Sequence, residues 1–480
     1  MNIPELIFDA LTKHHCRCLL SDTSRRLTGQ EIDQHVNSIA HELKNRDIIS
    51  GARVGICLRD QLNSIMTFLA CWKLGAIPVM FDFRIKPAER PKLVEIFNLT
   101  LFIEDSKRTE VVDRFVRWNT GWLDGQNAKL PLQPLDRDAT GCFLVSSGTT
   151  GTPKMYALSH EVLVSRMTNE SSFSTDGQRL FVSTLPVAFA ATHNHIFPCL
   201  INGIEFHFFP VMFTPSKLAE ALIDRKVTGV ILPPLTIKAL IDEVGPVDKP
   251  VFPDLLMLKC VGSAPSAEIM RNAYGRLTPG FVSSFGSGIG GVASLLVGQD
   301  AIDFPESAGK IIDGVRVEIL DRDTGRILPN GSTGIIKIYS DSVASGVFGE
   351  GQIDEQVGEG WAITGDIGLI DNDGYLFITN RMSDSIIRAG VAVSPNQTET
   401  VLKSHPDILD VAVIGVDDDR VGEEICAVVV APTLSEAQIM QFCMESFNQD
   451  KRPRLISLVE SLPYTRNGKL DRKAVRKNFT

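Results

Sequence analysis

The sequence has 480 residues, of which 44% are hydrophobic and 22% are charged, and its formal net charge at pH 7 is −10. A chain of this length and composition can bury large cores, and we expect two domains rather than one. The acidic balance argues against general nucleic-acid binding, because phosphate contacts need concentrated lysine and arginine, and the basic tail at 469–477 is too short to reverse it.

The first two thirds of the chain alternate short apolar runs with helical segments. Residues 53–58 read as a buried strand, 63–74 have helical periodicity, and 77–81 read as a second strand. The same alternation recurs at 229–243 and at 255–265, where an apolar run ends in a small-residue turn suited to close approach by a ligand. This pattern predicts an α/β fold.

The pattern changes after about residue 305. Residues 314–340 alternate apolar and polar side chains around two turns, as antiparallel strands do. Further on, 408–419 and 423–432 supply two strands with helical stretches on both sides, enough for a compact α+β module of roughly a hundred residues. We place a boundary near 380–385.

Cysteine usage and hydropathy indicate the compartment. The nine cysteines are scattered, mostly inside apolar runs, without metal-type spacing, so we expect buried reduced thiols. The N-terminus lacks the features of a signal peptide. Residues 180–204 carry no Asp, Glu, Lys or Arg, but prolines, histidines and asparagines interrupt them, so we interpret them as buried interior or pocket lining. The prediction is a cytoplasmic protein without a transmembrane segment.

The stretch SSGTTGTPK at 146–154 follows the predicted strand at 141–145. Its glycines allow backbone N–H groups to point into one concavity, its hydroxyls add donors, and Lys154 supplies a charge for phosphate oxygens. A polar surface turn is the alternative. The Walker pattern is absent, because Lys154 follows proline and precedes Met155.

Three further residues have chemistry that suits a nucleotide. Asp366 follows a strand and turn and can accept hydrogen bonds from ribose hydroxyls, and Arg381 can reach the ribose or a phosphate. Lys469 lies on a glycine-backed turn, where an ammonium group can stabilise negative charge on phosphate oxygens. The alternatives are a turn aspartate, a surface arginine and a solvated tail lysine.

Five motifs in order along the chain resemble those of the adenylate-forming superfamily, which includes acyl- and aryl-CoA synthetases. They occupy 146–154, 262–265, 360–368, 380–395 and 462–476. The resemblance implies an α/β fold: a large N-terminal domain of mixed β-sheets sandwiched by helices plus a β-barrel-like subdomain, with a small mobile α+β C-terminal domain. It places the adenylate-forming domain at 1–380 and the C-terminal AMP-binding enzyme domain at 381–480.

The resemblance also implies the reaction, an acid–thiol ligation. ATP would activate a carboxylic acid to an acyl-adenylate, and CoA would then take the acyl group. The motif at 380–395 is more similar to the acyl- and aryl-CoA synthetase form than to the peptide-synthetase form, and Ala190 after Phe189 disfavours an α-amino acid substrate. Two alternatives stay open: loading of a carrier-protein phosphopantetheine, and a nucleotide-binding protein of the same fold with weak or no ligase chemistry.

Site residues follow from the matched motifs. Lys469 would be the catalytic residue of adenylation, and Gly390 would line the thiol tunnel. The acid pocket would draw on Phe189, His193 and Gly290, although a satisfied core histidine is the favoured alternative for His193. The residues expected to bind ATP or AMP are Ser146, Ser147, Gly148, Thr149, Thr150, Gly151, Lys154, Gly262, Ser263, Ala264, Pro265, Phe285, Gly286, Ser287, Asp366 and Arg381.

Some positions depart from the family pattern. Gly288 and Ile289 replace a hydroxyl residue and a glutamate that normally helps to hold Mg²⁺, so we assign no protein metal ligand, although Mg²⁺ can be held by ATP phosphates and water. Ser383 stands where the hinge residue is commonly Asp or Lys. Asn380 replaces a usual glycine, a milder change because Asn tolerates positive φ comparatively well.

Overall fold

The computed structural model describes residues 2–105, 114–125, 128–145, 154–168, 176–348, 356–388, 391–418, 420–449, 451–465 and 470–477. The chain divides into two compact units. The first consists of Met1–Arg316 and Ile338–Ala362, and the second of Val317–Lys337 and Ile363–Thr480. The α/β class predicted from the sequence is confirmed, because parallel strands alternate with helices through most of the first unit.

A seven-stranded sheet of the first unit has the strand order β18-β8-β7-β4-β3-β5-β6. Its strands are β3 (Arg53–Cys57), β4 (Ile77–Met80), β5 (Leu101–Glu104), β6 (Phe115–Arg117), β7 (Thr140–Val145), β8 (Met155–Ser159) and β18 (Gly346–Phe348). The predicted strands at 53–58 and 77–81 are therefore confirmed as β3 and β4, which pair in parallel. Their side chains are mostly buried, as is typical of parallel strands covered on both faces.

A nine-stranded sheet completes the strands of this α/β part, in the order β15-β14-β13-β12-β11-β9-β10-β1-β2. Its strands are β1 (Cys18–Ser21), β2 (Arg26–Thr28), β9 (Leu180–Ser183), β10 (Glu205–Phe208), β11 (Gly229–Leu232), β12 (Met257–Cys260), β13 (Phe281–Ser287), β14 (Gly291–Val297) and β15 (Lys310–Ile311). β11, β12 and β13 are parallel neighbours, so their carboxyl ends meet at one edge of the sheet.

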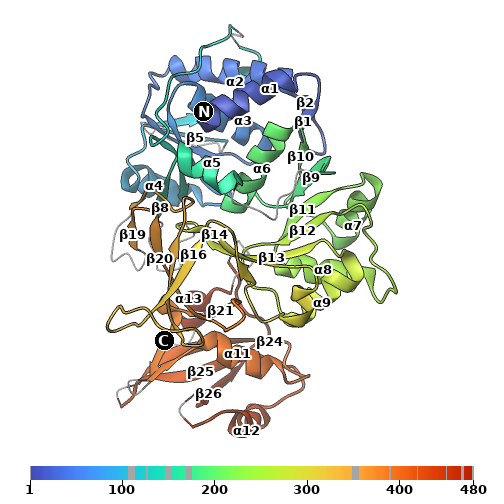
Figure 1. The fold of residues 1–480 in the computed structure, drawn as a ribbon, viewed down its shortest axis with the longest axis vertical. Coiled ribbons are helices and arrows are strands. Elements are labelled where there is room, and N and C mark those ends of the chain that lie inside the picture. The colour runs from blue at the N-terminus through green and yellow to red at the C-terminus, as the bar shows by residue number, and fades with distance from the viewer. Residues whose placement is uncertain are drawn as a thin grey trace. The chain divides into compact units, whose positions relative to one another are not determined.

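Helices cover both sheets, and Figure 1 shows α7, α8 and α9 beside β11 to β13. The described α-helices of the first unit are α1 (Ile3–Lys13), α2 (Gly29–Lys44), α3 (Gln61–Lys73), α4 (Arg90–Ile96), α5 (His160–Thr168), α6 (Ala190–Asn202), α7 (Pro215–Asp224), α8 (Pro234–Val244), α9 (Ala267–Asn272) and α10 (Asp300–Asp303). Two short 3₁₀ helices, η1 (Pro87–Glu89) and η2 (Thr120–Trp122), and a π-helix, η3 (Ala273–Leu277), complete this list. The helix predicted at 63–74 is α3. It begins two residues earlier because the Asp60 side chain caps it.

Near the start of the second unit, Leu320 and Ile327 form an antiparallel bridge, as the sequence predicts for 314–340. Most of a five-stranded sheet lies in this unit, with the order β16-β17-β20-β19 and β21 beside β20. Its strands are β16 (Arg316–Leu320), β17 (Gly334–Tyr339), β19 (Gln356–Gly358), β20 (Trp361–Ile370) and β21 (Leu376–Arg381).

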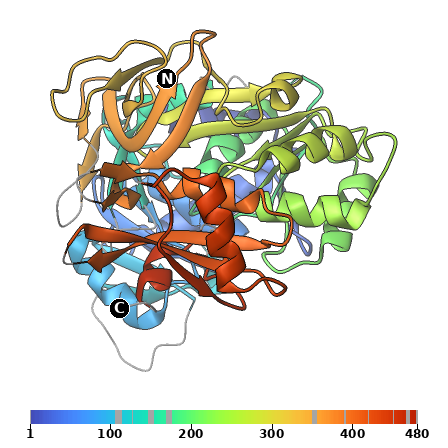
Figure 2. The ribbon, with the colours of Figure 1, turned by 90° about the horizontal axis from the view of Figure 1, so that it is seen from below.

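The C-terminal part of this unit is the expected α+β module. Its sheet has the order β23-β22-β25-β24, with β26 beside β25, and Figure 2 shows its orange and red elements packed side by side. The elements are η4 (Met382–Asp384), β22 (Ile386–Arg388), β23 (Val391–Val393), α11 (Pro395–Lys403), β24 (Asp410–Asp418), β25 (Gly422–Val430), α12 (Glu436–Ser446), β26 (Leu455–Leu458) and α13 (Arg472–Lys477).

Two other expectations concern apolar segments and thiols. The run at 180–204 forms β9 and α6, whose residues are largely buried, and no described helix has the length and hydropathy to cross a bilayer. Seven of the nine free cysteines are buried. Cys16 is exposed and Cys18 half-buried, so the expectation of buried thiols is wrong for these two residues, which lie beyond the apolar interior at the start of β1.

Candidate functional site

The predicted phosphate loop lies between two paired strands. β7 ends at Val145 and β8 begins at Met155, and these two residues pair across an antiparallel ladder. Lys154 is half-buried directly before β8. The other predicted ligands of this loop, Ser146, Ser147, Gly148, Thr149, Thr150 and Gly151, lie outside the described residues. The strand predicted before the loop is confirmed.

The second predicted nucleotide segment follows β12. Gly262 has a φ of +98°, which L side chains rarely adopt, and it is exposed together with Ser263 and Ala264, whereas Pro265 is buried. Ser266 then caps α9 by accepting a hydrogen bond from the Ile269 N–H at 3.2 Å. This exposed turn at the carboxyl end of a parallel strand leaves the backbone accessible, which suits a nucleotide.

The third segment is the turn between β13 and β14. At Gly286 a Cβ atom would lie 2.5 Å from the Gly291 carbonyl oxygen, so only glycine fits there. Phe285 is half-buried, and the strand register shifts between Phe285 and Gly286. The Ser287 hydroxyl accepts a hydrogen bond from the Gly290 N–H at 2.9 Å, and Gly290 itself is buried. These contacts hold the turn in one conformation.

The two departures from the family pattern are part of the packing of this turn. A Cβ at Gly288 would lie 2.7 Å from the Tyr156 ring, and Ile289 is completely buried. The buried Arg166 side chain donates to the Gly288 carbonyl at 2.8 Å and to the Ile289 carbonyl at 3.3 Å. The turn therefore offers Mg²⁺ no carboxylate, and the described residues contain no cluster of three His, Cys, Asp or Glu side chains suited to a metal ion.

Two of the three predicted acid-pocket residues lie at the start of α6, and the third, Gly290, lies in the turn between β13 and β14. Phe189 is the half-buried N-cap residue, and the Arg84 guanidinium carbon lies 6.0 Å from the centre of its ring. His193 is 2% exposed, and its ring lies 5.4 Å from that of Phe68 and 5.7 Å from that of Phe197. Burial lowers the pKa of His193 to about 4, although the Val187 backbone partly opposes this, so the ring is neutral at pH 7. The His193 ring therefore lies among aromatic side chains, and neither of its nitrogens has a hydrogen-bond partner among the described residues.

In the second unit, Asp366 and Arg381 face each other across β20 and β21, where they are paired residues in the ladder. The Arg381 Nε atom donates to Asp366 Oδ1 at 3.0 Å. Asp366 is 8% exposed, whereas the Arg381 side chain is 36% exposed. The contact orients the carboxylate. Next to it, Asn380 donates to the Ser385 hydroxyl at 2.9 Å.

The remaining two predicted residues, Gly390 and Lys469, lie outside the described residues, but the segments beside them are well anchored. β22 and β23 flank Gly390 and pair antiparallel. Around Lys469, Tyr464 and Leu470 form an antiparallel bridge, and the Arg472 guanidinium donates to both carboxylate oxygens of Glu399 at 2.6 and 2.7 Å.

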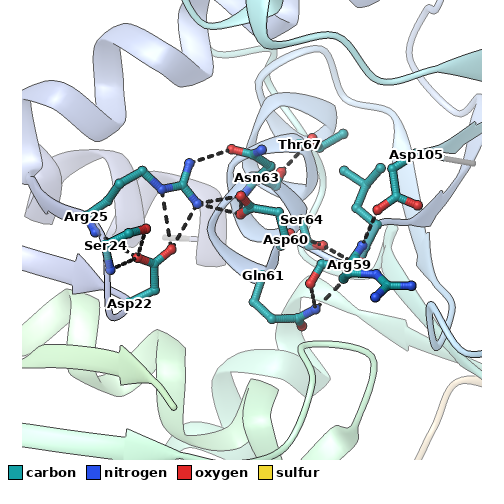
Figure 3. A network of polar contacts seen from close by, with 11 residues as sticks. Asp22, Ser24, Arg25, Arg59, Asp60, Gln61, Asn63, Ser64, Thr67 and Asp105 are labelled. Carbon is teal, nitrogen blue, oxygen red and sulfur yellow. Dashed lines mark hydrogen bonds and ion pairs between the residues drawn. The ribbon is translucent and has the colours of Figure 1, made fainter. Parts of the chain in front are cut away.

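A polar network at the start of α3, shown in Figure 3, is not among the features predicted from the sequence. Arg25 binds Asp22 at 3.0 Å and Asp60 at 2.6 Å, and it also donates to the Asn63 side chain at 3.1 Å. The adjacent Gln61 side chain accepts a hydrogen bond from the Val187 N–H at 2.8 Å. Asp60 carries an N-cap signal in the sequence, but no sequence signal indicates the contact across 126 positions.

Comparisons with known proteins agree over nearly the whole chain. A family model described as AMP-binding enzyme matches residues 8–348, and one described as AMP-binding enzyme C-terminal domain matches residues 397–469. A long-chain-fatty-acid–CoA ligase of Mycobacterium tuberculosis is 26% identical over 95% of this chain and 94% of its own length. A 4-coumarate–CoA ligase of Solanum tuberosum is 25% identical over 98% and 92%.

Solved structures have the same fold. ATP-bound MatB from Rhodopseudomonas palustris superposes with a TM-score of 0.89 at 20% identity, covering 100% of this chain and 99% of that one. The o-succinylbenzoate CoA synthetase of Bacillus subtilis, in complex with its acyl-adenylate intermediate, gives a TM-score of 0.86 at 20% identity and covers 98% and 97%. At these identities the likeness concerns the fold alone.

Proposed function

The chain belongs to the AMP-binding enzyme family, and we propose that it activates a carboxylic acid with ATP and then transfers the acyl group to CoA. Membership confirms the superfamily and the assignment as an AMP-forming acid–thiol ligase. The choice of CoA over a carrier-protein thiol is part of the proposal. It is supported by the relatives, which are named CoA ligases.

The reaction has two steps that share one intermediate, the acyl-adenylate. In the first, a carboxylate oxygen of the acid attacks the α-phosphorus of ATP, and pyrophosphate leaves. In the second, a thiol sulfur attacks the acyl carbon, AMP leaves, and the thiol proton passes to solvent. A free carboxylate resists nucleophiles because of its charge, whereas the mixed anhydride with AMP has a good leaving group.

The residues have distinct roles in this proposal. Asp366 accepts hydrogen bonds from the ribose hydroxyls, and Arg381 both orients that carboxylate and offers charge to the ribose or phosphate. The exposed turn at 262–264 and the turn at 285–287 border the nucleotide, and Lys154 contacts its phosphates. Lys469 stabilises the charge that develops during adenylation, and Gly390 leaves room for the thiol arm. Mg²⁺ would offset phosphate charge and would be held by phosphate oxygens and water.

The observation that carries the proposal is the pairing of Asp366 with Arg381 at 3.0 Å on neighbouring strands. Two residues selected from separate motifs, 15 positions apart, meet in one hydrogen bond. Opposite charges often pair across neighbouring antiparallel strands, but here the carboxylate is nearly buried and both residues belong to motifs that resemble those of nucleotide-binding relatives. This arrangement favours a ligand-binding carboxylate with a fixed orientation.

The test separates the two steps. Acid-dependent exchange of labelled pyrophosphate into ATP measures adenylation, and thioester formation from supplied acyl-adenylate measures transfer. Lys469→Ala should lower exchange by about a hundred- to a thousandfold and leave transfer largely intact. Gly390→Leu should do the reverse. Lys473→Ala, in which an exposed lysine of α13 is removed, is the matched control and should affect neither step.

Three outcomes would contradict parts of the proposal. Equal loss of both steps in Lys469→Ala would remove its assigned role. Transfer to a phosphopantetheinylated carrier protein but not to CoA would replace the acceptor. Binding of ATP without exchange for any acid in a panel of aromatic, medium-chain and short acids would favour a nucleotide-binding protein without ligase chemistry.

A further inference from the structure

Gln61 lies where three parts of the first unit meet. It is the first residue of α3, and the Arg25–Asp60 ion pair fixes the preceding cap residue. On the other side, the Arg59 N–H donates to Asp105 at 2.8 Å, just after β5. Figure 3 shows Gln61 between these anchors. The backbone that carries its side chain is therefore held from two directions.

The contacts of the Gln61 side chain fix the orientation of its amide group. Its nitrogen donates to the Arg59 carbonyl at 2.9 Å and to the Leu58 carbonyl at 3.3 Å. Because the nitrogen faces two carbonyl oxygens, the amide oxygen faces the other way, where it accepts the Val187 N–H at 2.8 Å. Val187 is completely buried. Without this acceptor its N–H would lose its partner in a site that water does not reach.

Val187 belongs to the segment that leads into the predicted acid pocket. The Phe189 N–H donates to the Pro186 carbonyl at 3.1 Å, and the Phe189 carbonyl accepts from the Thr192 N–H at 2.9 Å at the start of α6. The position of the Phe189 backbone thus depends on the turn at 185–189. α3 also packs against α6 directly, because the Phe68 ring contacts the His193 ring.

We propose that Gln61 is a positioning residue that sets acid selectivity by holding the backbone of residues 185–189, and with it Phe189, in place. The inference rests on the proposed function, because it takes Phe189 as part of the acid pocket. Gln61 acts through Val187 and not on the acid itself. Its loss should therefore affect acid binding and leave ATP binding unchanged.

The experiment compares Gln61→Met with Ser64→Ala in the pyrophosphate-exchange assay. Methionine keeps the length of the side chain and removes both hydrogen-bonding groups. Ser64 is the matched control, since its hydroxyl makes only local bonds in the same helical turn, to the carbonyls of Asp60 at 2.8 Å and Leu58 at 3.3 Å. KM for the acid and KM for ATP are measured for each variant, together with relative rates over a panel of acids.

We expect Gln61→Met to raise KM for the acid about tenfold, the size of effect that one unpaired buried N–H produces, and to change the ranking of acids. KM for ATP should change less than about twofold, and Ser64→Ala should change neither constant. Gln61→Glu retains an acceptor for the Val187 N–H and should recover part of the acid affinity. If Gln61→Met does not fold, the KM values of Gln61→Glu are compared with those of the wild type instead.

Two results would overturn the inference. An unchanged KM for the acid with an unchanged acid ranking would show that the contact between Gln61 and Val187 has no effect on acid binding. A parallel rise in both KM values would indicate a general loss of structure. Failure of the wild-type chain to exchange pyrophosphate with any acid would instead contradict the proposed function, so the two failures are distinguishable.

Discussion

Substitution of Asp366 by Asn tests the nucleotide site with a minimal change of shape. Arg381 donates to one carboxylate oxygen at 3.0 Å, and the proposed function has the carboxylate accept from two ribose hydroxyls. Hydrogen bonds to a charged group contribute about 1.5–3 kcal/mol each, against about 0.5–1.5 kcal/mol for neutral groups. Loss of the charge should thus weaken ATP binding by roughly 2–3 kcal/mol, which corresponds to a rise of about 30- to 150-fold in KM for ATP.

The measurement is pyrophosphate exchange with varied ATP at saturating acid. Asp371→Asn is the matched control, because this carboxylate accepts from the backbone N–H groups of Asp373 and Tyr375 in the turn between β20 and β21. The unfolding free energy of Asp366→Asn should change by about 1 kcal/mol or less, since Arg381 is more than a third exposed. A KM for ATP within twofold of wild type, or an equal rise in the control, would refute the assignment of Asp366 to the ribose.

Three other predictions concern stability. Glu104→Gln removes the counter-charge of the buried Arg90, which keeps hydrogen bonds to the Phe83 and Ile85 carbonyls, and should cost about 3–5 kcal/mol in urea unfolding. Glu161→Gln, in an exposed pair, should cost less than about 1 kcal/mol, and similar losses in the two variants would contradict this. Ile289→Glu restores the carboxylate of the family pattern but buries a charge, so it should lower the melting temperature without raising the rate of pyrophosphate exchange. A faster exchange than in the wild type would contradict this. Three buried histidines have a pKa lowered to about 4. As the pH falls from 6.5 toward 4, the unfolded chain therefore binds protons before the folded chain does. The unfolding free energy should fall over this range by up to about 1.4 kcal/mol per pH unit for each histidine. Urea titrations at several pH values measure this, and a constant value between pH 6.5 and 5 would contradict it; the three residues are His160, His193 and His207.

Local sequence signals predicted the local structure well. The alternation of short apolar runs with helical periodicity predicted β3, α3 and β4. It did so because buried side chains recur along the chain with a spacing that is typical of each kind of element. The predicted start of α3 lies two residues after the observed start, because helical periodicity alone does not reveal the cap residue Asp60. The small-residue turn after β12 is confirmed, whereas the turn predicted directly before Asp366 is wrong, because β20 runs unbroken from Trp361 to Ile370.

Contacts between distant residues were not predictable in this way. Gln61 and Val187 meet because α3 and the turn before α6 pack together in three dimensions, and neither residue has a pattern that indicates the other. The burial of Ile289 and the contacts of Arg166 with that turn likewise depend on the packing of α5 against the β13–β14 hairpin. The resemblance to the family marked this position as a departure, but only the structure gives its physical role.

That role bears on how phosphate charge is balanced in the proposed reaction. Gly288 packs against the Tyr156 ring and Ile289 fills the core, so the turn is held by apolar packing and by carbonyl contacts with Arg166. A glutamate at 289 would have to leave the interior or bury its charge. Because the turn contributes no carboxylate, the charge of a bound Mg²⁺ would be balanced by phosphate oxygens alone at this side. In the proposed function, Lys154, Arg381 and Lys469 would then offset the remaining phosphate charge.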